Sequence, residues 1–319
     1  MSTNYSLFEE PSTFDRQGLA ARLRELSARG ILIGGSSWKY AGWLGQVYTE
    51  SRYTTRGRFS KRLFEDNCLT EYAETFPAVC GDFAFYQFPT EDFWRRLFSK
   101  VPETFQFGFK IPEQITCRVF PMHQRYGATA GLDNPAFLDA GLLMESFLRP
   151  LEPYRSKTGV LIFEFGTFSR RAMSGVDEFV ERLDAFLEVL PGNFRYSVEI
   201  RNPEFLEAQY FACLARHNVA HVFNAWTKMP DLPVHVAIPN SRTADFVVCR
   251  ALLKRGREYE EAVKKFAPYT EVQEVYEPVR KGLRELIEIA RQERRTTFIF
   301  VNNRLEGNSP GTIVSITDD

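Results

Sequence analysis

The segment ILIGGSSWKYAG, Ile31 to Gly42, separates the two folds that the rest of the sequence allows. Its apolar start and paired glycines are typical of a strand that runs into a loop. An open, doubly wound sheet usually carries G-x-G-x-x-G after its first strand, where it binds a dinucleotide phosphate. Since this segment lacks that spacing, it favours a closed barrel of parallel strands.

The rest of the chain repeats an alternation of strand and helix. Strand-like runs lie at 31–36, 80–88, 105–111, 159–165, 194–200, 219–224, 245–251 and 296–302. Helical patterns lie at 61–76, 90–100, 133–149, 174–190, 203–217 and 270–294. Eight strands separated mostly by helices predict a TIM-type (β/α)₈ barrel. We expect a single barrel domain over residues 31–317, preceded by a helix-bearing extension over residues 1–30.

Composition narrows the class of protein. The 319 residues carry 40 basic and 41 acidic side chains, so a dedicated nucleic-acid binder is disfavoured. The chain shows no signal-peptide pattern and no apolar run approaching the roughly 20 residues that span a bilayer. Its five cysteines form no C-x-x-C pair, and we interpret them as reduced thiols. A soluble cytoplasmic protein without membrane partners is expected.

Charged residues recur at the predicted strand ends. Alternation along 105–111 separates Phe107 and Phe109 from Lys110, and alternation along 194–200 places Glu199 and Arg201 together. If the apolar faces meet the helices, the polar faces point to the barrel axis, where charges must be paired or wet. Two interpretations stay open: an ion-pair network that closes the barrel, and a mixed-charge pocket at the C-terminal face of the strands.

Two loops are candidates to line that pocket. Trp38, Tyr40 and Trp43 follow the first strand and predict an aromatic wall, although burial of the loop in the barrel top is an equal alternative. After the last strand, Ser309 precedes Pro310 as a predicted helix N-cap. The backbone amides of this loop, together with the cation of Arg250, would suit a phosphate group. The alternative is a capped helix that binds no ligand.

Several separated motifs resemble the YecE-like family, also called domain of unknown function 72, over roughly residues 31 to 317. They are "GSSWKYAGW", "LTEYAETFPAV" with "FYQFP", "VPETFQFGFKIPEQIT", "VEIRNPEF" and "FVNNRLEGNSPGTI". The resemblance implies a TIM-type barrel and no established activity. It marks Lys110, Glu199, Arg201, Asn302 and Asn303 as positions that match the family's motifs.

Five positions depart from the family's usual pattern. The chain has Cys80, Asp82 and Ala84 in the second block, where the family usually has glutamate, asparagine and threonine. It has Cys117 in place of a common histidine. Glu164 replaces a glutamine after the fourth strand. Asp82 and Glu164 therefore become candidates for the missing carboxylate and for altered chemistry.

The residue types limit the chemistry. None of the four histidines, His123, His217, His221 and His235, lies at a matched strand end or forms a zinc motif, so no transition metal is expected. An oxygen-only Mg²⁺ site from Asp82, Glu164 and Glu199 stays open. So does metal-free acid–base chemistry, such as hydrolysis of a glycosidic bond by two carboxylates.

We therefore expect a pocket that binds a small anionic, phosphate-bearing or sugar-like ligand. Hydrolysis of that ligand is one interpretation of the same pocket. A non-catalytic binder of a nucleotide or single-stranded nucleic acid is the alternative. The catalytic candidates are Glu199, Lys110, Asp82 and Glu164. The ligand-binding candidates are Trp38, Tyr40, Trp43, Tyr86, Arg201, Arg250, Asn302, Asn303 and Ser309.

Overall fold

The structure, a computed structural model, describes residues 14–318 and contains a closed barrel of eight parallel strands. The barrel strands are β1 (Ile31–Gly35), β4 (Ala78–Gly81), β5 (Gln106–Lys110), β6 (Thr158–Glu164), β7 (Tyr196–Glu199), β8 (Ala220–Ala225), β9 (Phe246–Ala251) and β10 (Thr296–Val301). Neighbours in the chain are neighbours in the barrel, and β1 closes it by pairing with both β10 and β4. The predicted TIM-type fold is confirmed.

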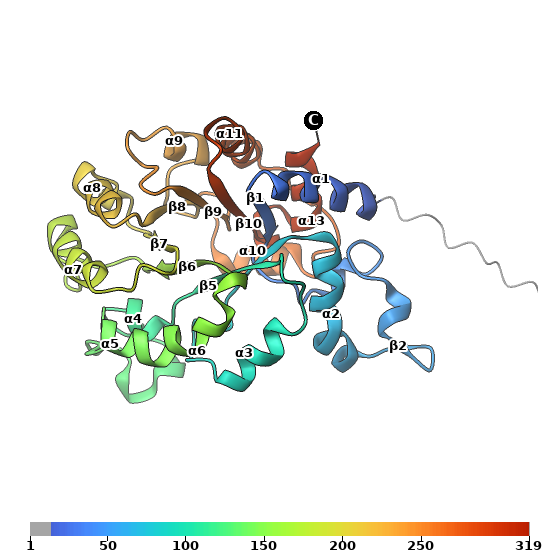
Figure 1. Cartoon of the computed structure of the whole chain (residues 1–319), viewed down its shortest axis with the longest axis horizontal. Coiled ribbons are helices and arrows are strands. Elements are labelled where there is room, and N and C mark those ends of the chain that lie inside the picture. Colours follow the sequence, from blue (N-terminus) through green and yellow to red (C-terminus); the bar gives the residue numbers. More distant parts are fainter. Residues whose placement is uncertain (1–13, 319) are drawn as a thin grey trace, which may run out of the picture.

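Helices surround the strands, as Figure 1 shows. They are α1 (Arg16–Ala28), α2 (Lys61–Thr75), α3 (Glu91–Phe98), α4 (Glu113–Thr116), α5 (Ala140–Leu143), α6 (Arg149–Leu151), α7 (Val176–Glu188), α8 (Ala208–Arg216), α9 (Leu232–Val236), α10 (Tyr259–Phe266), α11 (Glu277–Glu293), α12 (Asn303–Glu306) and α13 (Ser309–Thr317). A small antiparallel pair, β2 (Thr54–Thr55) and β3 (Arg58–Phe59), lies outside the barrel.

All eight predicted strands are present, and one of them ends well before its predicted end. The run 80–88 was predicted as a strand, whereas β4 ends at Gly81. The chain turns there, because the Phe85 amide donates to the Asp82 carbonyl at 3.0 Å. Alternation therefore does not apply beyond Asp82, so the candidate Tyr86 does not share a strand face with Asp82.

Three helices also begin several residues after the start of the helical patterns that predicted them. In 133–149 the helix begins at Ala140, after Asp139 accepts from the Leu142 amide as N-cap. In 203–217 it begins at Ala208, and in 270–294 it begins at Glu277, with a proline in its first turn. Proline fits the first turn of a helix because no intrahelical partner is lost there. Apolar periodicity alone did not locate these starts.

The barrel interior is apolar through most of its depth. Interior side chains from six strands form one cluster: Leu32, Ala78, Cys80, Val160, Ile162, Ala220, Val222, Phe246, Val248, Phe298 and Phe300, joined by Ala244. The two phenylalanines of β10 reach across to glycines. A Cβ on Gly108 would lie 2.7 Å from the Phe300 ring, and one on Gly159 would lie 2.6 Å from the Phe298 ring. The expected polar lining is therefore confined to the ends of the barrel.

The outer faces of the strands pack against the helices through aromatic rings. Phe107 and Phe109 are fully buried, and Phe109 lies 4.9 Å from Trp94 of α3 between ring centroids. At the N-terminal side, Leu19 and Leu23 of α1 join the same core cluster as Ile33 of β1. The part of the predicted extension over residues 1–13 lies outside the described residues. Within residues 14–318, no helix has the length and apolar character needed to cross a membrane.

Candidate functional site

A ring of polar side chains occupies the C-terminal mouth of the barrel. Cys80, Ile162, Val222, Val248 and Phe300 belong to the interior cluster, so the residue two positions after each also faces inward. Each barrel strand contributes one polar residue within one position of its carboxyl end. This polar ring consists of Ser36, Asp82, Lys110, Glu164, Glu199, Asn224, Arg250 and Asn302.

Glu164 is the centre of an ion-pair network in the polar ring. Its Oε2 accepts from Arg250 Nη1 at 2.6 Å and lies 3.1 Å from Lys110 Nζ. Its Oε1 lies 3.0 Å from Arg201 Nη2. Glu199, fully buried, pairs with Arg250 through Oε2 and with Arg201 through Oε1. Asp82 is farther away, at 3.6 Å from Lys110 and 3.8 Å from Arg250.

This network is electrically balanced. Lys110, Arg201 and Arg250 face the same number of carboxylates, Asp82, Glu164 and Glu199. Each carboxylate already has a cation, so a Mg²⁺ ion at this position would have to compete with three buried or half-buried basic side chains for the same oxygens.

The pKa values of the buried pair follow from this geometry. Burial by itself would raise the pKa of Glu164, but Arg201, Lys110 and Arg250 outweigh it and hold that pKa well below its usual range. Burial opposes the charge on Arg250, yet Glu199 and the other nearby anions raise its pKa. Glu164 is therefore ionised at neutral pH and cannot donate a proton as a general acid.

Two aromatic rings cover the cations of the network. The Arg201 guanidinium lies 3.7 Å from the ring centre of Trp226, and Lys110 Nζ lies 3.7 Å from that of Phe85. Both rings are half-buried, so each also offers surface to the outside. The mouth thus combines charges with planar apolar faces.

Several polar atoms at the mouth lack a partner. Ser36 Oγ, Asp82 Oδ1, Asn224 Oδ1, Arg250 Nε and Asn303 Nδ2 are buried and make no hydrogen bond within residues 14–318. A buried polar atom without a partner costs about 1–3 kcal/mol. These atoms include both acceptors and donors. A ligand that forms hydrogen bonds with all of them therefore needs both donor and acceptor groups.

A cavity of about 520 Å³ opens beside Asp82, between the β1 loop, α2 and α3. Trp38, Leu69, Phe83, Phe93 and Leu97 supply its apolar surface. A larger cavity of about 670 Å³ lies at the opposite, N-terminal end, next to Thr158, Arg195 and Phe246. Barrel enzymes place their chemistry at the C-terminal end, and the smaller cavity reaches that end at Trp38 and Asp82, although Asp82 is the one member of the polar ring that lines it.

Residues 32–319 match the family described as "Protein of unknown function DUF72". The chain belongs to the DUF72 family. UPF0759 protein YecE of Escherichia coli K12 is 28% identical over 179 residues, which are 54% of this chain and 56% of YecE. The chain thus matches a little over half the length of this curated relative.

Solved DUF72 structures have the same fold. A DUF72 family protein from Thermotoga maritima has a TM-score of 0.59 at 19% identity, covering 90% of this chain and 96% of that one. One from Enterococcus faecalis has a TM-score of 0.55 at 15% identity, covering 90% and 94%. These structures share the barrel fold with this chain.

The predicted aromatic residues do not form one wall. Trp38 lines the cavity beside Asp82, and its ring lies 5.9 Å from Phe83. Trp43, in contrast, is fully buried and packs against Tyr40 and Tyr72, so it offers no surface to a ligand. Tyr86 is exposed and lies under the Arg125 guanidinium instead of at the ring. Of the expected wall, only Trp38 contacts the cavity.

In the loop after β10, asparagine side chains cap the N-termini of the two short helices α12 and α13. The N-cap of α13 is Asn308, not Ser309 as predicted, and its side chain accepts from the Gly311 amide at 2.7 Å. The Ser309 amide donates to Asn303 Oδ1 at 2.7 Å, and Asn302 caps α12 through the Arg304 amide. The amides of Ser309 and Gly311 are therefore occupied, and Arg250 is paired elsewhere. The expected phosphate site is not formed in this arrangement.

Three residues of the mouth were missed as ligand-binding candidates. Ser36, Asn224 and Trp226 are not among the ligand-binding candidates that the sequence suggests. A signal was present, because Asn224 and Trp226 end the run VAHVFNAW and share a face with the interior residue Val222. Extending alternation to the end of every strand would have found Asn224.

Proposed function

We propose that the protein binds a small, neutral, sugar-like ligand at the polar ring, with Asp82 and Trp38 at the entrance. The observation that carries the proposal is the set of buried, unpartnered polar atoms at the mouth, above all Ser36 Oγ and Asn224 Oδ1. Their cost is removed when an outside group supplies hydrogen bonds. A sugar hydroxyl both donates and accepts, so it satisfies either kind of atom.

Charge favours a neutral ligand over an anionic one. The three cations of the network are already paired with carboxylates, so an added phosphate would place new negative charge beside Asp82, Glu164 and Glu199. An aromatic face supports a sugar as well, since the half-buried ring of Trp226 offers flat apolar surface, whereas Trp38 lines the cavity with 5% of its area exposed. This choice narrows the sequence expectation, which included anionic ligands.

Asp82 is the carboxylate that a ligand reaches first. Its side chain is 43% exposed, whereas those of Glu164 and Glu199 are 7% and 0% exposed. Its Oδ1 is buried and ion-paired with Lys110 at 3.6 Å and with Arg250 at 3.8 Å, but both distances exceed a hydrogen bond, so this oxygen can still accept one from a hydroxyl that enters the mouth. If the ligand is hydrolysed, Asp82 is the group able to exchange a proton with it.

The test is a titration of the protein with a panel of neutral monosaccharides and aryl glycosides. Calorimetry and Trp fluorescence report binding, and release of the aryl group reports hydrolysis. Asp82→Asn should weaken binding by about 10-fold or more, because a hydrogen bond to a charged group contributes about 1.5–3 kcal/mol. Asp245→Asn is the matched control, since Asp245 lies at the amino end of β9, at the far end of the barrel.

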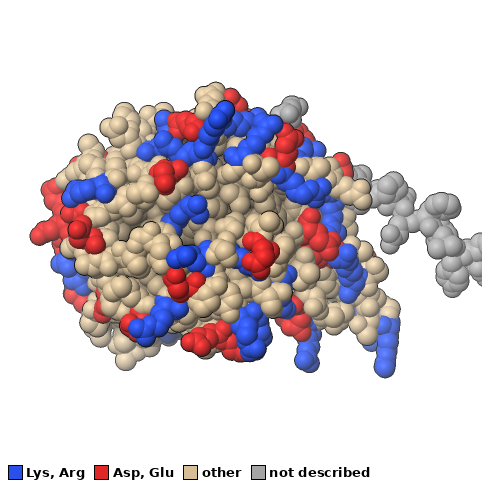
Figure 2. Space-filling model, viewed as in Figure 1, with Lys and Arg blue, Asp and Glu red and all other residues tan. Residues whose placement is uncertain are grey.

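Sugar binding that is equal in wild type and Asp82→Asn, or absent from the whole panel, would count against the proposal. The same titration with inorganic phosphate and with a labelled oligonucleotide tests the anionic and nucleic-acid alternatives. In Figure 2, basic and acidic side chains are interspersed over the face drawn, with no continuous basic band for a nucleic-acid backbone. Oligonucleotide affinity that falls steeply with salt would reopen that alternative.

A further inference from the structure

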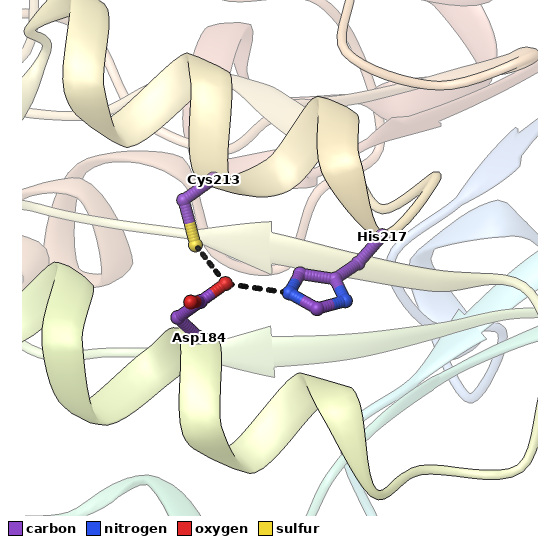
Figure 3. A group of neighbouring side chains, drawn as sticks. All are labelled: Asp184, Cys213 and His217. Atoms are coloured by element: carbon purple, nitrogen blue, oxygen red, sulfur yellow. Dashed lines mark hydrogen bonds and ion pairs between the residues drawn. The ribbon is translucent and has the colours of Figure 1, made fainter.

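A second cluster of metal-ligating side chains lies in the outer helical layer, between α7 and α8. Asp184 of α7 lies between Cys213 of α8 and His217 at the end of α8, as Figure 3 shows. His217 Nε2 is 2.6 Å from Asp184 Oδ1, and Cys213 Sγ is 3.7 Å from the same oxygen. The three potential ligand atoms all lie within 4.8 Å of one another.

We propose that Asp184, Cys213 and His217 form a binding site for Zn²⁺, with a fourth position open to solvent. Sulfur, imidazole nitrogen and carboxylate oxygen are the three ligand types that Zn²⁺ takes from proteins. Cys213 and His217 are four residues apart on α8, so their side chains project from one face of that helix. The site differs from the polar ring and from the expectation that no transition metal is bound.

The distances suit a site that is nearly formed. Tetrahedral ligands at about 2.0–2.3 Å from Zn²⁺ are about 3.3–3.7 Å apart. The Cys213–Asp184 separation of 3.7 Å already has this value. The His217–Asp184 hydrogen bond of 2.6 Å has to open by well under 1 Å, which a small side-chain rotation supplies.

Neighbouring residues hold two of the ligands in orientation. Glu188, one turn after Asp184, has Oε2 3.8 Å from His217 Nδ1, the nitrogen that would not bind the metal. This distance is beyond a hydrogen bond, and a small rotation of Glu188 would bring it to the position from which carboxylates orient metal-binding histidines. Arg216 Nη1 donates to Asp184 Oδ2 at 2.9 Å and to Oδ1 at 3.0 Å; because this arginine is 58% exposed, it can keep Oδ2 and leave Oδ1 to the metal.

The same three residues do not activate the Cys213 thiol as a nucleophile. Burial raises the pKa of Cys213 to about 11, so its thiol is protonated at neutral pH. Its Sγ contacts a carboxylate, which does not stabilise a thiolate. A divalent cation does stabilise it, and binding then releases the thiol proton to solvent.

Co²⁺ added to the chelator-treated, full-length protein tests the site, because Co²⁺ bound to a thiolate absorbs strongly in the near ultraviolet. We expect one equivalent to bind with this band and one equivalent of Zn²⁺ to displace it. Cys213→Ala should remove the band, and His217→Ala should lower the affinity. Glu188→Gln, which keeps all three ligands, should weaken Zn²⁺ binding by about 10-fold.

Cys117→Ala is the matched control, since Cys117 follows α4 and contacts the Val119 carbonyl, apart from this cluster. It should keep the band. Because Cys213 is fully buried, its variant could fail to fold; His217, at the half-exposed helix end, then carries the test. Absence of Co²⁺ uptake by the wild type, a band that persists in Cys213→Ala, or Zn²⁺ affinity unchanged in both His217→Ala and Glu188→Gln would overturn the proposal.

Discussion

Arg250 Nη1 donates to Glu164 Oε2 at 2.6 Å, although the two residues are 86 positions apart in the sequence. Their side chains are 2% and 7% exposed, so the pair is out of water. Arg250 comes from β9 and Glu164 from β6, and the bond therefore joins strands that are not neighbours in the barrel. This ion pair therefore links β6 and β9 across the C-terminal mouth of the barrel, above the apolar interior.

Removing one member of this pair should be costly. Arg250→Met leaves Glu164 and Glu199 with one cation fewer in a buried site, and we expect the free energy of unfolding to fall by about 3–5 kcal/mol. Urea denaturation measures it. The control is Arg149→Met, which breaks an exposed pair with Glu145 and should change stability by no more than about 0.5 kcal/mol. An equal loss of unfolding free energy in the two variants would mean that the buried network stabilises the fold no more than an exposed ion pair does.

Glu164 also predicts a response to acid. Its folded pKa is held below the ordinary value of 4.5, so it stabilises the fold above pH 4.5 and loses that contribution as pH falls. Glu164→Gln should be less stable at neutral pH, and its stability should decline less between pH 5 and 3 than that of the wild type. Unfolding free energies at a series of pH values provide the comparison, and parallel curves would contradict the assignment.

A buried histidine pair predicts a second pH effect, nearer neutrality. His221 and His235 share a 2.8 Å hydrogen bond between their Nε2 atoms, behind β8. Burial lowers the pKa of His235 to about 4, from an ordinary 6.5. The unfolded chain binds more protons at this position between these values, so the His235 contribution to stability should fall by about 3 kcal/mol as pH drops from 6.5 to 4, and His221, whose pKa burial also lowers, should add to the fall. His235→Gln should flatten this part of the profile; a profile identical to that of the wild type would exclude His235 as its source.

The interior glycines predict a steric effect. A Cβ at Gly108 would lie 2.7 Å from the buried Phe300 ring, whereas a Cβ at Gly166 would meet nothing within 4 Å. Gly108→Ala should therefore reduce stability by about 1–3 kcal/mol through overpacking, and Gly166→Ala should be close to neutral. Thermal melts of the two variants measure the difference. A neutral Gly108→Ala would mean that Phe300 has room to move.

The fold could be predicted because its signals are local. Each of the eight strands is a short apolar run, and the missing phosphate fingerprint after Ile31–Gly35 removed the main competing fold. The end of β4 could not be predicted, because the run 80–88 stays aromatic while the chain turns at Asp82. Periodicity reports burial, and the loop residue Ala84 is as buried as a strand residue.

The site could be predicted in part. Alternation placed Lys110, Glu199 and Arg201 at one end of the barrel, and the structure has them there in one network with Glu164. It could not show that Trp43 packs inside the loop that carries it, or that Asn303 and Asn308 use up the amides after β10. Side-chain pairing between distant segments sets those outcomes, and one sequence does not encode it in any local pattern.

Electron density at the barrel mouth, in crystals grown with a neutral monosaccharide, tests the central claim most directly. We expect a bound sugar whose hydroxyl groups lie within hydrogen-bond distance of Ser36 Oγ, Asp82 Oδ1 and Asn224 Oδ1, the buried atoms that lack partners within the described chain. A mouth without sugar density, in which Ser36 and Asn224 have turned to pair with neighbouring residues, would contradict the account and leave the polar ring as a purely structural network.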